Sequence, residues 1–141
     1  MTKGDMMHKA MAITGLVLLA GCKPDWMPEP VEGQKLFADN CAVCHGTDAR
    51  GGGELARDLP TAPPDLTLIS ARAGGNFPTA KVLSQIDGYT RMQGRDQVMP
   101  EYGALLEGDT VPVQLAEDEF SPVPRPLAAL VAYLESIQRG R

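Results

Sequence analysis

Apolar residues recur at the spacing of a helix in the segment that begins at Pro78. Val82, Leu83 and Ile86 share one side of such a helix, and a proline suits its first turn. Gly88 follows these residues and is a typical place for a helix to end. The pattern therefore predicts a helix that buries one of its faces.

Two further helices are predicted, with loops between them. One runs from about Val31 to Asn40 and the other from about Pro126 to Gln138. The stretch 46–64 is rich in Gly, Pro, Asp and Thr, and 91–103 is polar and irregular, so both are predicted to be loops. The acidic and proline-rich segment 105–126 is interpreted as a loop too. These elements predict an all-α domain with three main helices, long loops and little regular β structure. The inner face of the last helix is formed by Leu127, Leu130, Val131 and Leu134.

The first 21 residues do not fit this pattern. Lys3 and Lys9 flank a polar start, and an apolar run follows from Ala10 to Cys22. The run is too short to span a bilayer as a helix, which takes about 20 apolar residues. A basic start, a short apolar core and small residues at its end are typical of a secretory signal peptide.

The end of this segment, Leu19-Ala20-Gly21-Cys22, resembles the lipobox of bacterial lipoproteins. That resemblance implies that Cys22 is lipidated and becomes the mature N-terminus; the alternative is an ordinary signal peptide that ends near a cysteine. Two acyl chains hold a protein stably at a membrane. Residues 22–30 are proline-rich and predict a flexible tether, which leaves 31–141 as the folded domain.

Removal of residues 1–21 leaves 120 residues with 11 Lys and Arg against 17 Asp and Glu, a net charge of −6. Nucleic-acid binding normally requires a basic face, so this charge argues against it. It favours partner proteins that present a basic docking surface, although net charge constrains partners only weakly.

Cys41, Cys44 and His45 are the residues of the remaining chain best suited to bind a metal or a cofactor. Once Cys22 is assigned to lipid, they are its only cysteines and its only histidine. A structural zinc site needs four ligands, and no further cysteine or histidine completes the set. A thioredoxin-like dithiol is expected after a strand in a βαβ unit, which is not predicted here. A disulfide between the two cysteines is compatible with export but leaves His45 without a role.

The spacing C-x-x-C-H is the attachment pattern of c-type haem. Thiols three residues apart on one helical turn can reach the two vinyl groups of a porphyrin, and the next residue can direct its imidazole at the iron. We therefore predict one haem c, attached covalently through Cys41 and Cys44, with His45 as an iron ligand.

The residues around this motif resemble the small class I cytochromes c. Gly33 and Phe37 precede Cys41, and "LVAYL" runs from Leu130 to Leu134. In that family a glycine and an aromatic of the first helix cross a C-terminal helix that bears Leu and Tyr. The resemblance implies that Gly33 allows close approach of the two helices, that Phe37, Leu130 and Tyr133 pack at the crossing, and that the helices surround one haem. It covers about 31–104 and 124–138 and departs from the family at the insertion 105–126, which is either a partner-docking flap or a solvated loop.

The loop after His45 resembles the proximal Pro-x-Leu element of the family at Pro64 and Leu66. The resemblance implies that the Pro64 carbonyl accepts the proton of His45 Nδ1 and that Leu66 packs on the haem. Pro63 could take the carbonyl role instead, and an ordinary loop proline is the remaining alternative. The glycines 51–53 are expected to let the backbone pass close to the haem edge.

The sixth iron ligand is expected to be a methionine, because no second histidine is present. Met99-Pro100 resembles the family's Met-Pro ligand element. Met92 is the alternative and is otherwise expected to pack against the haem, while Met27 is assigned to the tether. An iron that is open or bound by lysine also remains possible. Tyr102 either hydrogen-bonds a haem propionate or packs at the surface.

Ligation by His45 and Met99 fills both axial positions and raises the reduction potential relative to two histidines. The resemblance therefore implies an electron carrier and not an enzyme, tethered to a bacterial membrane and facing the periplasm, where it exchanges electrons with redox partner proteins. One alternative is a subunit through which electrons enter a larger oxidoreductase. The other is a peroxidase-like or gas-binding haem protein, which needs an open sixth position.

Overall fold

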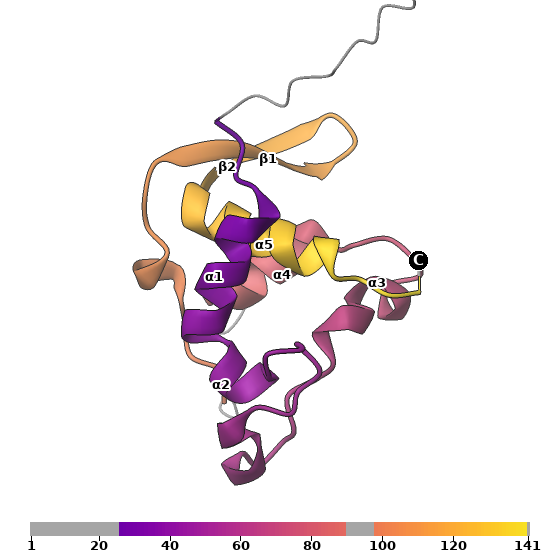
Figure 1. Cartoon of the computed structure of the whole chain (residues 1–141). Coiled ribbons are helices and arrows are strands. Elements are labelled where there is room, and N and C mark those ends of the chain that lie inside the picture. Colours follow the sequence, from indigo (N-terminus) through magenta and orange to yellow (C-terminus); the bar gives the residue numbers. More distant parts are fainter. Residues whose placement is uncertain (1–25, 90–97, 141) are drawn as a thin grey trace, which may run out of the picture.

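The computed structural model describes residues 26–89 and 98–140, and this part of the chain is mainly helical (Figure 1). The predicted signal peptide, Cys22 and Met92 lie outside these residues. Five α-helices, and not only the three predicted, lie within them, together with short 3₁₀ turns (η) and a two-stranded sheet. The elements are, in chain order, α1 (Pro30–Asn40), α2 (Ala42–His45), η1 (Glu54–Asp58), η2 (Leu66–Leu68), α3 (Ile69–Arg72), α4 (Thr79–Asp87), η4 (Gly103–Leu105), β1 (Thr110–Ala116), β2 (Glu119–Pro124) and α5 (Arg125–Ser136).

The first and last helices cross where Gly33 of α1 meets α5. A Cβ atom at Gly33 would lie 1.9 Å from the Ala129 carbonyl oxygen and 2.7 Å from Tyr133 Cβ, so only glycine permits this approach. One turn further along α1, the Phe37 ring lies 5.4 Å from the Tyr133 ring, centroid to centroid, with a tilt of 51°. The predicted crossing and its packing around Phe37, Leu130 and Tyr133 are confirmed.

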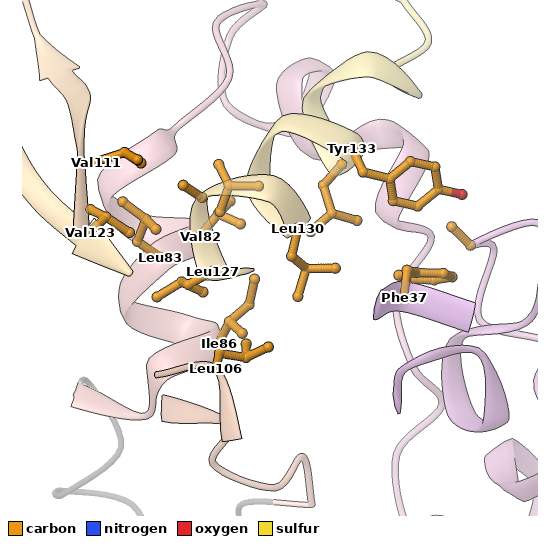
Figure 2. Packing of buried hydrophobic residues seen from close by; sticks show 14 residues of the cluster. Phe37, Val82, Leu83, Ile86, Leu106, Val111, Val123, Leu127, Leu130 and Tyr133 are labelled. Atoms are coloured by element: carbon orange, nitrogen blue, oxygen red, sulfur yellow. The ribbon is translucent and has the colours of Figure 1, made fainter. Parts of the chain in front are cut away.

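The core is built on α5, whose four predicted inner-face residues are all buried. The predicted apolar face of α4 packs against them, and that helix ends at Gly88 as expected. Figure 2 shows side chains of α4, α5 and the two strands meeting in one cluster, with Phe37 reaching it from α1.

The segment 105–126 is not the loop that the sequence predicted. It contains β1 and β2, which pair antiparallel with Val111 opposite Val123 and Val113 opposite Ser121. Val111 and Val123 are each 6 % exposed, so the hairpin closes one side of the core. Alternation of Val111, Val113 and Leu115 with outward residues is the period of a strand, and it was visible in the sequence. The domain is therefore mainly helical, as predicted, and has a two-stranded sheet that was not predicted.

The stretch just before α1 contacts the domain. Pro28 is buried, and Met27 packs against the core. Arg125, the first residue of α5, donates to the Trp26 carbonyl and pairs with Glu32 at 2.8 Å. The described end of the predicted tether thus lies against the start of α5.

Candidate functional site

A cavity of about 580 Å³ opens between the end of α1, the α2 turn, the loop 59–66, α3, α4 and the segment 98–102. Figure 1 shows how these elements are arranged: α2 lies at the lower end of α1, α4 and α5 lie above it, and α3 lies to their right. Apolar side chains form most of its wall. The six residues predicted to bind a cofactor all line it: Cys41, Cys44, His45, Pro64, Leu66 and Met99.

The tight turn after α1 places the two cysteines and the histidine. The Cys41 carbonyl accepts hydrogen bonds from the backbone N–H groups of Cys44 (3.2 Å) and His45 (2.9 Å). The two thiols are free. Burial raises the pKa of the Cys41 thiol to about 11, with a smaller contribution from the charge of Cys44. Burial thus favours the protonated thiol at this position.

The His45 imidazole is half-buried, and burial lowers its pKa. The Pro64 carbonyl opposes this shift, so it lies close to the ring as predicted. The expected hydrogen bond is not formed in ordinary geometry, however, because the buried Nδ1 has no partner among the described residues. Burial favours the neutral imidazole, which is the form that ligates iron.

The glycines after His45 allow close contacts within the loop itself. Gly51 has φ +88°, its N–H donates to the His45 carbonyl at 2.7 Å, and a Cβ there would lie 2.1 Å from the Pro63 oxygen. A Cβ at Gly53 would lie 2.4 Å from the Val43 oxygen. These glycines let the loop pack on the α2 turn itself and carry the chain back to Pro63.

The segment that carries Pro64 and Leu66 is held by the C-terminal end of the chain. Gln138 donates to the Leu66 carbonyl at 2.8 Å and accepts from the Ser70 N–H at 2.8 Å. Arg139 pairs with Asp65 at 3.0 Å. The Thr67 hydroxyl, which donates to Asp65, is the main cause that holds the pKa of this carboxyl below its ordinary value, and the charge of Arg139 adds to the effect. Sequence reasoning missed Gln138 and Arg139 because their partners lie about 70 residues away and no local pattern marks them.

Met99 is partly buried and lies in the cavity wall. Three residues on, the Tyr102 N–H donates to the Ile86 carbonyl at 3.1 Å and its hydroxyl donates to the Asn40 carbonyl at 2.9 Å. The Tyr102 hydroxyl is thus engaged with α1 and is neither a surface group nor a free donor for a propionate. The structure brings Met99 to the same cavity as His45, while Met92 lies outside the described residues.

The cavity suits haem in size and chemistry. Its volume lies within the range of about 300–1,000 Å³ found for small-molecule and cofactor sites. Haem is a flat apolar ring with two carboxylates, and Arg72 and Lys81 at the cavity wall form no ion pair within residues 26–89 and 98–140. The described part of the chain has no group of three Cys, His, Asp or Glu side chains arranged for a metal ion alone.

The model of the protein family described as Cytochrome c matches residues 30–138. The chain is 30% identical over 109 residues to the Cbb3-type cytochrome c oxidase subunit CcoP of Rhodobacter capsulatus, covering 77% of this chain and 29% of that protein. It is 30% identical over 111 residues to the Cbb3-type cytochrome c oxidase subunit FixP of Azorhizobium caulinodans, covering 79% of this chain and 32% of that protein.

A shorter match, 41% identical over 54 residues, is to the FixP subunit of Sinorhizobium medicae and covers 37% of this chain and 19% of that protein. The chain thus spans less than a third of the length of these relatives. No solved structure matches the chain significantly.

Proposed function

The chain belongs to the cytochrome c family and carries covalent haem c, and from this premise we propose that it is a membrane-tethered electron carrier with a single haem. Cys41 and Cys44 hold the haem, His45 and Met99 ligate its iron, and the carrier passes single electrons between periplasmic redox partners. The observation that supports this proposal best is that His45 and Met99 line the same largely apolar cavity. The bound haem supplies the one-electron chemistry of its iron.

The chain's own residues set the conditions of that chemistry. Burial keeps the His45 imidazole neutral, and the Pro64 carbonyl lies next to the ring. Leu66 and the core residues Leu130 and Leu134 exclude water from the cavity wall. His45 and Met99 would supply an imidazole and a thioether to the iron and would leave no open position for a substrate, so the chemistry that the haem would supply here is electron transfer.

Met99→Ala tests this ligation. The wild type is expected to show the long-wavelength band of a methionine-ligated ferric haem and no binding of carbon monoxide after reduction. The variant is expected to lose the band, bind carbon monoxide stoichiometrically and have a lower reduction potential. Met27→Ala is the matched control, because Met27 packs on the opposite side of the core, at the hairpin. Rapid binding of carbon monoxide by the wild type would instead support the gas-binding or peroxidase-like alternative.

The proposed anchor is a lipid on Cys22, supported by the lipobox-like sequence at 19–22. Among the described residues no helix has the length and apolarity required to cross a bilayer. Cells fed an alkyne-tagged fatty acid are expected to label the wild type and to leave Cys22→Ala unlabelled, since no other cysteine precedes the haem motif. Haem staining of both proteins is the control for synthesis. Label that persists on Cys22→Ala would refute the anchor.

A second candidate function is a subunit through which electrons enter a larger oxidoreductase. It is favoured by the relatives, which are named as oxidase subunits, and by the hairpin, where Phe120 is 60% exposed beside Glu117, Asp118 and Glu119. The acidic residues fit a partner with a basic docking surface.

Affinity purification from solubilised membranes distinguishes the two candidates. If the chain is such a subunit, it co-purifies with other redox proteins in fixed ratio, and Phe120→Ser reduces their recovery severalfold. Val31→Ser is the matched control, because Val31 is 68% exposed on α1. Purification without partners, with both variants indistinguishable from the wild type, would support the independent carrier.

A further inference from the structure

The stretch 98–102, which contains Met99 and Pro100, ends at Tyr102, and every polar group of Tyr102 forms a hydrogen bond. The backbone N–H donates to the Ile86 carbonyl of α4, and the backbone carbonyl accepts from the N–H groups of Leu105 and Leu106, both at 3.0 Å. Leu106 is 3% exposed and is part of the core cluster. The segment is thus anchored to α4 and, through Leu106, to the core.

The Tyr102 hydroxyl joins this segment to the residue that precedes the turn carrying the cysteines. It donates at 2.9 Å to the carbonyl of Asn40, the last residue of α1 and the neighbour of Cys41. Carbonyls in the last turn of a helix lack partners within the helix, so this acceptor is available for a long-range bond. The bond joins positions 62 residues apart and is partly buried.

We propose that the Tyr102 hydroxyl is a positioning group that keeps Met99 on the iron. This inference rests on the proposed ligation by His45 and Met99. The haem is attached to the turn that follows Asn40. Met99 lies three residues before Tyr102, in the stretch 98–102. The bond between Tyr102 and Asn40 therefore sets the separation of the segment from the haem, and its loss frees Met99 to leave the iron more often.

The expected effect is an easier replacement of Met99 by an added ligand. An added ligand binds only the fraction of molecules in which Met99 has left the iron, so its apparent affinity rises with that fraction. The loss of a single hydrogen bond between neutral groups corresponds to a change of about three- to tenfold. The Tyr102 ring packs against the core, so Tyr102→Phe removes the bond and retains the packing.

The experiment is a titration of the oxidised, haem-loaded protein with imidazole, followed by the haem absorption spectrum. Tyr102→Phe is expected to bind imidazole about three- to tenfold more tightly than the wild type. Tyr133→Phe is the matched control: its ring packs on Phe37, and its hydroxyl is in none of the hydrogen bonds between described residues. It is expected to bind imidazole as the wild type does. Met99→Ala, which has no thioether to displace, is the reference for full access.

Three other results would contradict the ligation by Met99 or the role of Tyr102. If Met99→Ala binds imidazole no better than the wild type, Met99 is not the ligand, and the proposed ligation fails together with this inference. If Met99→Ala binds tightly while Tyr102→Phe matches the wild type, the ligation stands and the positioning role is refuted. If Tyr102→Phe and Tyr133→Phe gain the same affinity and lose the same stability in urea, Tyr102 is only a structural residue, and the inference is wrong.

Discussion

Replacement of both Cys41 and Cys44 by alanine is expected to give a chain that has no covalent haem and does not reach its native helical content. The reason is the cavity that the haem fills. Large empty volumes in a core destabilise a protein by about 24 cal/mol per Å³, which for 580 Å³ gives an upper limit of about 14 kcal/mol. Water that enters the cavity lowers this cost. The limit is nevertheless as large as the whole stability of a typical domain, about 5–15 kcal/mol.

Two measurements check this prediction. Haem staining of a denaturing gel is expected to be positive for the wild type and negative for the double variant. Far-ultraviolet circular dichroism is expected to show that most of the helical signal is lost. Cys22→Ala is the control, because Cys22 precedes the folded domain and is expected to leave both signals unchanged. Native helical content in the double variant would show that the protein part folds without its haem.

Gly33→Ala is expected to destabilise the domain by about 3 kcal/mol or more, although alanine is the better helix former. The new Cβ would lie 1.9 Å from the oxygen and 2.5 Å from the carbon of the Ala129 carbonyl. These are backbone atoms inside α5, so they can move only if the two helices separate. Separation would open the contact of Phe37 with Tyr133 beside the haem cavity.

Urea unfolding of the haem-loaded protein, followed by circular dichroism, measures this effect. The matched control is Gly52→Ala, because a Cβ at Gly52 would meet nothing within 4 Å, and it is expected to change stability by less than about 0.5 kcal/mol. A Gly33→Ala variant as stable as the wild type would show that α1 and α5 do not approach as closely as described.

Most of the helical framework could be predicted because its signals are local. The face of α4 repeats at helical spacing, and Gly88 ends that helix within a residue of the prediction. The hairpin had a local signal as well, the alternation of Val111, Val113 and Leu115. Pro112 and Pro122 obscured it, since proline argues against a strand unless it lies at an edge. In a two-stranded sheet every strand has such an edge.

The sequence by itself determined the cofactor, through its attachment motif, and the first and last helices, because each depends on residues at short, regular spacing. That these two helices cross was implied by the resemblance to the small cytochromes c. Only the tertiary structure decided what supports the site. Tyr102 reaches Asn40 across 62 residues, Gln138 reaches Leu66 across 72, and Gly51 lies against Pro63. Such contacts leave no periodic trace along the chain, because either partner alone is an ordinary residue. They exist only once the helices have packed and brought distant segments of the chain to one cavity.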